Sequence, residues 1–206
     1  MDIENRKIAD RYNQLSNRYD MIDCFIPLRW RRLAVSFSYG RVLEVGVGTG
    51  LNFPYYCKQC TEILGIDIST GMLEKAKEKI SLCPVPLRLE CMNVQDITLE
   101  SASIDSVLAT FVFCTVPNYL QGLRECHRIL KPGGKLILLE HMSSDNKLFC
   151  SLMNLVNPFA LKLINDNINR DTAKAVVNSG FEIERMNNLL GDIVRLIVAR
   201  KNIMIG

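Results

Sequence analysis

The chain of 206 residues is poor in histidine and tryptophan and has no strong excess of charge of either sign. It contains two histidines and one tryptophan, and its 25 basic and 22 acidic side chains give a formal net charge of +3. This balance gives no electrostatic reason to expect a nucleic acid as a partner. His127 and His141 are distant in the sequence, and Cys57 and Cys60 form a CxxC pair without a second pair, so no metal site is expected.

Long apolar runs are also missing. No apolar run reaches the roughly 20 residues that span a bilayer, and the first ten residues, MDIENRKIAD, lack the apolar segment of a secretory signal. The eight cysteines are scattered, several of them in apolar stretches, which favours free thiols in a reducing compartment. We therefore expect one cytoplasmic domain whose core is large enough to need no disulfide bonds.

A short glycine-rich stretch is the most informative feature that the sequence does contain. Residues 41–50, RVLEVGVGTG, combine an apolar run with glycines at every second position. The apolar residues predict a buried strand, and the glycines let the backbone turn tightly against a ligand. These glycines are Gly46, Gly48 and Gly50. A dinucleotide-binding fingerprint would require a further glycine where Leu51 stands, which disfavours NAD or FAD.

The rest of the chain alternates between strand and helix patterns. Further strands are expected at 63–66, 86–91, 104–113 and 135–139, followed by a hairpin of 181–187 and 193–199. Helices are expected at 3–20, 27–37, 52–60, after Ser69, at 116–130 and at 169–179. Such alternation is typical of α/β proteins. We predict a seven-stranded, mostly parallel sheet with an antiparallel C-terminal hairpin and helices on both faces.

We expect a single domain in four parts. They are a helical N-terminal cover (1–39), a cofactor-binding core (40–143), an apolar helical insertion (144–168) and a C-terminal helix and strand pair (169–206). The basic segment 27–37 and the apolar segment 146–164 are candidates for peripheral contact with a membrane surface. The alternatives are a solvated helical face for the first segment and packing against the N-terminal cover for the second.

An acidic residue strengthens the interpretation of the glycine loop. Asp67 follows the strand 63–66, about 20 residues after the loop, where an acceptor for ribose hydroxyls is expected. Met72, on the next helix, is placed to cover an adenine ring, although a position in the core is the alternative. Together the loop and Asp67 predict a site for a nucleoside-containing ligand at the carboxyl edge of the sheet.

Several stretches resemble the class I S-adenosylmethionine-dependent methyltransferases. These stretches are LEVGVGTG, LGIDISTGMLEKAKEK, SIDSVLATFVFCTVPN and LRECHRILKPGGKLILLEH, preceded by RYNQLSNRYD and RWRR. They are similar to the group that contains the ubiquinone/menaquinone biosynthesis methyltransferases, the phospholipid N-methyltransferases and the methyltransferase-like thiol methyltransferases. The resemblance implies a Rossmann-like fold, S-adenosylmethionine as cofactor and S-adenosylhomocysteine as product.

The resemblance also implies cofactor contacts. Glu44 and the loop glycines would surround the methionine and ribose, Asp67 would bind the ribose diol, and Ile68 and Met72 would flank adenine. The family usually has Asp-Ala where Asn93 and Val94 stand, so the adenine contact would come from Asn93 or from Asp96. The full expected set is Tyr12, Tyr19, Glu44, Gly46, Gly48, Gly50, Asp67, Ile68, Met72, Asn93, Val94, Thr110 and Phe111.

Methyl transfer is an in-line displacement, so the protein mainly aligns donor and acceptor and excludes water. A general base is needed only for a protonated acceptor. His141, after the strand 135–139, is the candidate, with a structural histidine as the alternative. Tyr19, which matches the RYD motif, is the second candidate catalytic residue.

The leading hypothesis is a methyltransferase for a small apolar or lipid-like acceptor, a phospholipid amine or a quinone-type ring. A thiol S-methyltransferase and a non-catalytic cofactor-binding partner subunit are the alternatives.

Overall fold

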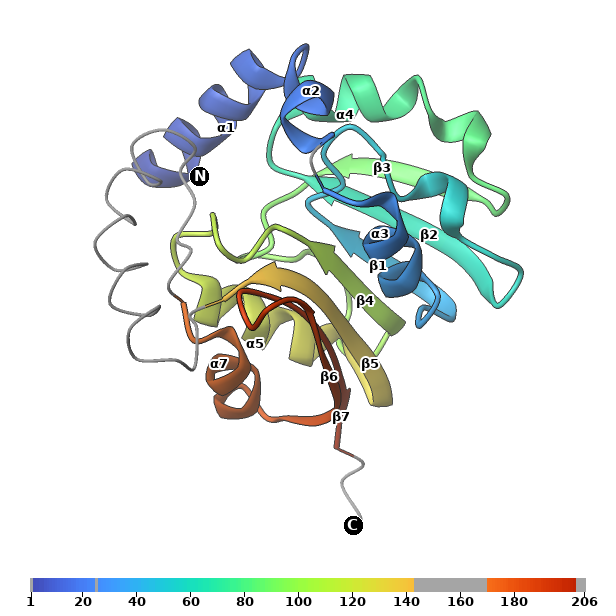
Figure 1. The fold of residues 1–206 in the computed structure, drawn as a ribbon, viewed down its shortest axis with the longest axis vertical. Coiled ribbons are helices and arrows are strands. Elements are labelled where there is room, and N and C mark those ends of the chain that lie inside the picture. The colour runs from blue at the N-terminus through green and yellow to red at the C-terminus, as the bar shows by residue number, and fades with distance from the viewer. Residues whose placement is uncertain (1, 25, 143–169, 203–206) are drawn as a thin grey trace.

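The computed structural model describes residues 2–24, 26–142 and 170–202 (Figure 1). The expected insertion at 144–168, with its membrane-contact candidate 146–164, lies outside the described residues.

A seven-stranded sheet forms the centre of the molecule, with the order β3-β2-β1-β4-β5-β7-β6. Strands β1 to β5 run parallel, and β7 is antiparallel to both β5 and β6, so the predicted topology is confirmed. The strands are β1 (Gly40–Val45), β2 (Cys60–Asp67), β3 (Leu87–Cys91), β4 (Ile104–Thr110), β5 (Leu130–His141), β6 (Phe181–Leu190) and β7 (Val194–Lys201). The strand order reverses between β1 and β4, and ligands of such sheets bind at the carboxyl ends beside this reversal.

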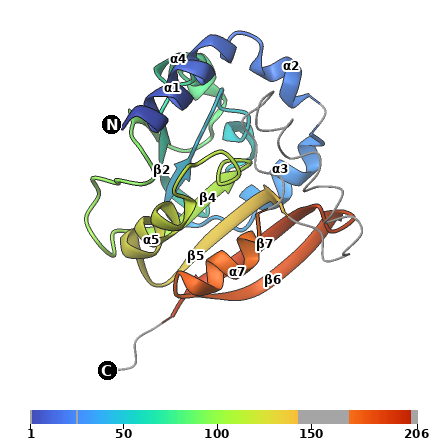
Figure 2. The same ribbon diagram turned by 90° about the vertical axis from the view of Figure 1, so that its left-hand side faces the viewer.

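Helices cover both faces of the sheet, as predicted (Figures 1 and 2). They are α1 (Ile3–Leu15), α2 (Tyr19–Asp23), α3 (Leu28–Val35), α4 (Thr70–Lys77), α5 (Tyr119–Ile129) and α7 (Thr172–Asn178), with 3-10 turns η1 (Phe53–Tyr55) and η2 (Ile80–Leu82). Apolar residues of α3 and α4 form one half of the core, and those of α5 and α7 form the other half. None of the helices in the described part of the chain combines the length and the apolar character needed to cross a bilayer.

The expected helix over 3–20 is divided in two. Helix α1 ends at Leu15, and α2 begins at Tyr19 after a tight turn in which the Arg18 N–H donates to the Leu15 carbonyl at 2.8 Å. The Ser16 hydroxyl donates to the Asn13 carbonyl at 2.9 Å, a local bond of the kind that competes with helix continuation. The apolar stripe predicted the helix but not this break.

Other boundaries also differ from the prediction. The strand expected to reach Phe113 ends at Thr110, because Phe111 adopts a left-handed conformation with φ 58°. The helix expected from Val116 begins only after Asn118, whose side chain accepts the Gln121 N–H. Strand β5 begins at Leu130 instead of 135 and so includes the residues that were expected to form a turn. Its register with β4 shifts at this point. The helix expected over 52–60 is limited to η1.

Helix α1 is fixed against the start of α4 by one side chain. The Asn13 Oδ1 atom accepts hydrogen bonds from the Ser69 hydroxyl at 2.7 Å and from the Gly71 N–H at 2.9 Å. Helix α1 and the start of α4 approach so closely that a Cβ at Gly71 would lie 3.1 Å from the Asn13 Cα. Helix α1 therefore lies across the carboxyl edge of the sheet, above the strand reversal (Figure 1).

Replacing Asn13 tests this attachment. We expect Asn13→Ala to cost about 1 kcal/mol of local stability, because it leaves the Gly71 N–H without its acceptor. Amide hydrogen exchange should therefore accelerate in residues 3–15 while the strands keep their protection. Asn17→Ala, at an exposed position just after the same helix, is the matched control. Equal exchange in α1 of the two variants would contradict the proposed attachment.

Candidate active site

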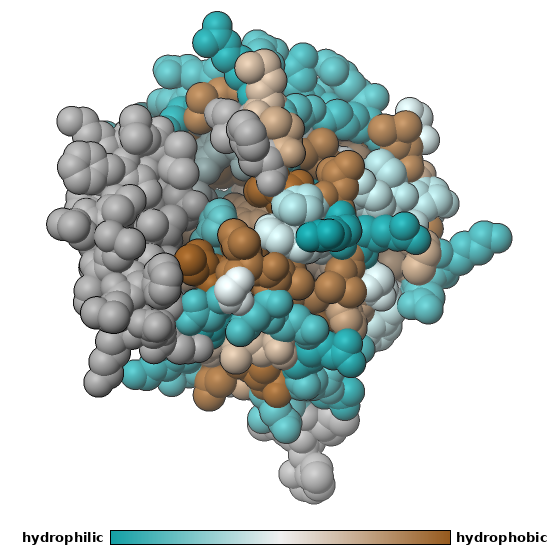
Figure 3. All heavy atoms as spheres, in the orientation of Figure 1, coloured by the Kyte–Doolittle hydropathy of each residue, from teal (hydrophilic) through white to brown (hydrophobic). Residues whose placement is uncertain are grey.

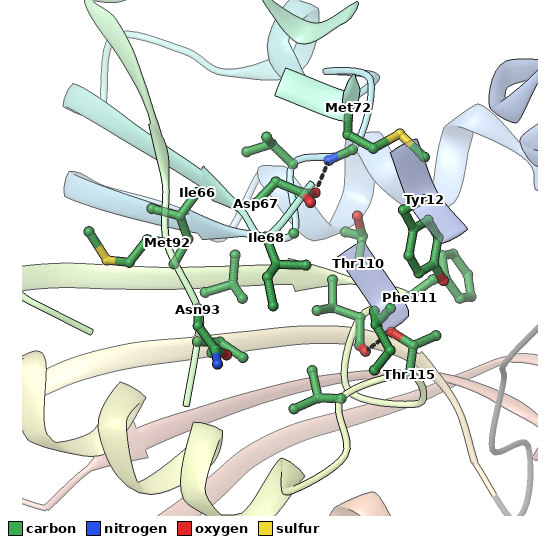
Figure 4. A pocket seen from close by; sticks show the side chains of 18 of the residues that line it. Tyr12, Ile66, Asp67, Ile68, Met72, Met92, Asn93, Thr110, Phe111 and Thr115 are labelled. Atoms are coloured by element: carbon green, nitrogen blue, oxygen red, sulfur yellow. Dashed lines mark hydrogen bonds between the residues drawn. The ribbon is translucent and has the colours of Figure 1, made fainter. Parts of the chain in front are cut away.

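A cavity of about 830 Å³, including its open mouth, lies at the carboxyl edge of the sheet beside the strand reversal (Figure 4). Its walls come from the ends of β1, β2 and β4 and from the N-terminal helices α1 and α2. All of the expected cofactor residues except Glu44 and Gly50 line this cavity. The topology thus brings residues from both halves of the chain to one place.

The glycine loop after β1 requires glycine for its backbone conformation. Gly46, Gly48 and Gly50 have φ values of 60°, 53° and 84°, a region that other residues rarely adopt. A Cβ at Gly46 would lie 2.6 Å from a Val112 methyl carbon, and one at Gly50 would lie 2.5 Å from the Phe53 ring. Gly46 and Gly48 face the cavity, whereas Gly50 serves the packing of the turn.

The carboxylate of Asp67 is held at the end of β2 by backbone donors. It accepts the Gly48 N–H at 2.9 Å and the Ser69 N–H at 2.8 Å, and it remains partly exposed to the cavity (Figure 4). Burial raises the pKa of Asp67 to about 6, although hydrogen bonds from backbone N–H groups oppose this shift. At neutral pH the group is therefore mostly an anion that can accept hydrogen bonds from a diol.

One side of the cavity combines an apolar wall with an amide. Ile68 and Met72 lie on this side, and Asn93 follows β3 (Figure 4). The Asn93 Oδ1 atom accepts the Gln95 N–H at 3.0 Å, while the Asp96 side chain is exposed and does not line the cavity. Of the two candidates for an adenine contact, Asn93 is therefore the residue at the cavity.

Two tyrosines lie over the glycine loop from the N-terminal helices. The rings of Tyr12 and Tyr19 meet edge to face with centroids 6.0 Å apart, and a Cβ at Gly48 would lie 3.9 Å from the Tyr19 ring. Burial, followed by the proximity of Tyr12, raises the pKa of Tyr19 well above its ordinary value. Tyr19 therefore stays a neutral hydroxyl near pH 7.

Glu44 lies behind the glycine loop and not on the cavity. Its side chain is buried and accepts hydrogen bonds from the Tyr56 hydroxyl at 2.7 Å and the Asn52 amide at 2.8 Å. The same Asn52 amide donates to the Thr110 hydroxyl at 3.0 Å, and Thr110 does line the cavity. Burial raises the pKa of Glu44 to about 7 against the lowering effect of its two donors.

The position of Arg31 differs from the expectation for the basic segment 27–37, which was a solvated face or a membrane contact. The residue is only 5% exposed and lines the cavity, and its guanidinium pairs with Asp23 at 2.6 Å. Arg29 and Arg32 are exposed, as expected. Helical spacing could have identified Arg31, because it precedes the buried Ala34 and Val35 by three and four residues.

The loop after β4 is fixed by two charged side chains that sequence reasoning missed. The Glu140 Oε1 atom accepts the N–H groups of Val112 and Phe113 at 2.8 and 2.9 Å. From the other side, the Arg170 guanidinium donates to the Phe113 and Val116 carbonyls and lies over the Tyr119 ring. An anion and a cation thus hold the N–H and C=O groups of one loop.

His141 lies next to Phe111 at the end of β5. The two ring centroids are 4.8 Å apart, and His141 is not among the described residues that line the cavity. The Phe111 ring lines the cavity and lies against the imidazole. The role of His141 as a base therefore stays a prediction.

The fold and the site define a doubly wound α/β protein with a ligand cavity at the reversal of its strand order. Residues 43–138 match a family model described as a methyltransferase domain. The chain is 32% identical over 162 residues to the ubiquinone/menaquinone biosynthesis C-methyltransferase UbiE of Geotalea uraniireducens, covering 72% of this chain and 69% of the relative. The chain belongs to the class I S-adenosylmethionine-dependent methyltransferases.

Two further comparisons agree with this assignment. A phosphatidylethanolamine N-methyltransferase of Cereibacter sphaeroides is 35% identical over 122 residues, covering 58% of this chain and 59% of that protein. The crystal structure of a SAM dependent methyltransferase from Aquifex aeolicus shares the fold with a TM-score of 0.65 at 17% identity, covering 94% of this chain and 98% of that chain.

The residues present fit the cofactor, S-adenosylmethionine. The loop has no Cβ at Gly46 and Gly48 that would fill the cavity, and the Asp67 carboxylate faces it as an acceptor. When bound, the cofactor supplies an electrophilic methyl group on a sulfonium. We infer that this chain holds the ribose at Asp67 and adenine between Ile68, Met72 and Asn93, and shields the reacting centre from water with Tyr12 and Tyr19.

Replacing Asp67 tests the ribose contact. We expect Asp67→Ala to weaken S-adenosylhomocysteine binding by about 1 to 3 kcal/mol, because it removes hydrogen bonds to a charged acceptor. Isothermal titration calorimetry measures the change. Asp96→Ala, an exposed position outside the cavity, is the control and should bind normally. Unchanged affinity of the Asp67 variant would show that the ribose is held elsewhere.

Glu44 should make stability depend on pH. Its folded pKa, about 7, exceeds its ordinary value of 4.5, so between these values the folded state holds a proton that the unfolded state lacks. The free energy of unfolding therefore falls as pH rises through this window, by about 3 kcal/mol at most for a shift of this size. Glu44→Gln removes this contribution while keeping the shape of the side chain.

Chemical denaturation at several pH values checks the effect of Glu44. Asp67 has a raised pKa as well and acts in the same direction, so the wild type must be compared with the variant at each pH. We expect the stability advantage of the wild type over Glu44→Gln to be larger at pH 5 than at pH 8. A difference that stays constant with pH would contradict the raised pKa of Glu44.

Proposed function

We propose that the protein transfers a methyl group from S-adenosylmethionine to a small apolar or lipid-like acceptor, a phospholipid amine or a quinone-type ring. The observation that carries this proposal is the apolar character of the cavity wall after β4. Its members are Phe111, Val112, Val116 and Pro117, with Thr115 as the one polar side chain among them. Such a wall supports an apolar acceptor, because a polar one would leave its hydrogen-bonding groups without partners.

This wall faces the part of the cavity where the reaction would occur. Phe111 and Thr115 lie across the cavity from Asp67 and Met72 (Figure 4). With the nucleoside at Asp67, the acceptor would therefore approach along Phe111 and Thr115. Glu140 and Arg170 hold this loop by its backbone, so the wall is fixed before an acceptor binds.

Methylation of either acceptor also requires the removal of a proton. A phospholipid ammonium must lose a proton before its nitrogen can attack, and a quinol ring must lose one when its carbon is methylated. Tyr19 keeps its proton at neutral pH because its pKa is raised, so it is not available as a base and its proposed role is to position the acceptor or the cofactor. His141 lies next to the Phe111 ring and is not among the described residues that line the cavity, so to act as a base it would have to come closer to the acceptor.

The names of the relatives support both acceptor types. The Geotalea protein is named for ubiquinone/menaquinone biosynthesis, and the Cereibacter protein for phosphatidylethanolamine. We therefore propose a phospholipid amine and a quinone-type ring as equally ranked acceptors. A thiol S-methyltransferase and a non-catalytic partner subunit remain the alternatives.

We also propose that the protein works in the cytoplasm in peripheral contact with a membrane. Four large apolar side chains are at least 36% exposed on α3 and β6. They are Leu28, Leu33, Met186 and Leu190. Arg29 and Arg32 are exposed on the same helix, α3. Apolar side chains gather in the middle of the view in Figure 3, between α3 and the β6–β7 hairpin. Apolar and basic groups together favour a surface of anionic lipid.

Methyl transfer from labelled S-adenosylmethionine tests the acceptor class. The protein is incubated separately with phosphatidylethanolamine vesicles, a demethylated quinol, an alkyl thiol and a set of polar amines. We expect label in the phospholipid or the quinol, and the Asp67→Ala variant should lose this transfer because it binds less cofactor. Label only in a polar amine would overturn the lipid-like acceptor, and label only in the thiol would favour the first alternative.

A further inference from the structure

The two ends of the cavity differ in charge. Among the described residues that line it, Arg31 and Asp67 are the only side chains with a full charge at neutral pH. Asp67 stands at the end of β2, on the side of the cavity that carries Ile68 and Asn93. Arg31 approaches from α3 and contacts Thr110 at the end of β4. The cavity therefore has a single buried cation near the end that is distant from Asn93.

The guanidinium of Arg31 is held in one position by partners on three elements. Nη2 donates to Asp23 at 2.6 Å, and Nη1 donates to Thr110 at 2.9 Å and to Asn52 at 3.3 Å. A guanidinium has five N–H donors. These bonds use three of them, and Nε has no acceptor among the described residues. Nε is shielded from solvent and both N–H groups of Nη1 are used, so the donor that remains for another anion is the second N–H of Nη2.

The cost of this arrangement points to a role beyond stability. The side chains of Arg31 and Asp23 are only 6% and 3% exposed, and buried ion pairs contribute little net stability because both charges lose their hydration. Asp23 balances the charge, so the cavity does not repel a cationic ligand outright. The result is a fixed, locally neutral set of donors at the cavity wall.

The cofactor has a matching group. S-adenosylmethionine carries an adenine at one end and an α-amino acid at the other, and its only anionic group is the α-carboxylate. The side of the cavity with Ile68, Met72 and Asn93 suits adenine. Asp67 suits the ribose between the two ends. This order leaves the amino-acid end next to Tyr19, Thr110 and Arg31.

We propose that Arg31 binds the α-carboxylate of the cofactor. It is a positioning residue: by fixing the amino-acid end, it sets the direction in which the sulfonium methyl points toward the wall after β4. This inference concerns the cofactor alone and does not depend on which acceptor the enzyme uses.

The test compares two ligands that differ in one group. S-adenosylhomocysteine has the carboxylate, whereas S-adenosyl-3-thiopropylamine keeps the amine and lacks the carboxylate. Calorimetry gives both dissociation constants for the wild type and for Arg31→Met. We expect the wild type to prefer S-adenosylhomocysteine at least tenfold. The variant should lose this preference, because its affinity for S-adenosylhomocysteine falls while its affinity for the decarboxylated ligand stays within about twofold of the wild-type value.

Two further variants complete the experiment. Arg32→Met is the matched control, because Arg32 is exposed on the same helix, and it should leave both dissociation constants unchanged. Arg31→Met alone leaves Asp23 buried without its partner and could unfold the protein. The double variant Asp23→Leu/Arg31→Met replaces both charges with apolar side chains and provides the same comparison in a folded protein.

Several outcomes would overturn the inference. Equal affinity of the wild type for both ligands would exclude a carboxylate contact without any variant. If Arg31→Met or the double variant weakened both ligands equally, Arg31 would be structural. If both ligands bound normally while the KM for the acceptor rose, Arg31 would contact the acceptor instead. The dissociation constants of the two ligands can be measured without an identified acceptor, so failure of the proposed acceptor class would leave them valid.

Discussion

The carboxyl ends of β1 and β4 carry a continuous set of buried polar side chains, and the arrangement of the site depends on them. Glu44 and Asn52 on one side and Thr110 and Arg31 on the other are linked by hydrogen bonds of 2.8 to 3.3 Å. Buried polar groups must find partners, so each of these bonds fixes the relative position of two elements. The glycine loop, α3 and the end of β4 are therefore assembled as one unit at the strand reversal.

Asp67 connects this unit to the next strand. Its carboxylate accepts one N–H from the glycine loop and one from the start of α4, so these two segments share an acceptor at the end of β2. Helix α1 is attached to the same start of α4 through Asn13. The floor and one side of the cavity are thus tied together by short polar contacts, while the core beneath them is apolar.

The sequence was sufficient to predict the parts of the fold that depend on local pattern. The alternation of strands and helices, the glycine loop and the position of Asp67 all follow from residue type and spacing. The break at Leu15 and the end of β4 at Thr110 were not predictable in this way. They depend on a side chain bonding to its own backbone and on a non-glycine residue with positive φ.

The site was predicted where its residues follow strands and missed where they come from distant segments. Arg31 and Glu140 lie 79 and 28 residues from the groups they contact at the end of β4, and no periodicity connects such positions. For Glu44, by contrast, the sequence predicted a contact at the cavity that the structure does not show. Its place in the motif suggested a cofactor contact, but the alternation of side chains along β1 directs it into the buried polar set.

The position of α1 bears on how the cavity can exchange its contents. Asn5, Ile8 and Tyr12 of this helix all line the cavity, and the Asn5 amide oxygen accepts a hydrogen bond from Gln95 at 2.7 Å, in the loop that carries Asn93. Widening the cavity on this side requires α1 to lift and to break its bonds at both ends. A nucleoside that leaves on this side would therefore require α1 to detach from α4, a helix motion of the kind that limits turnover in many enzymes.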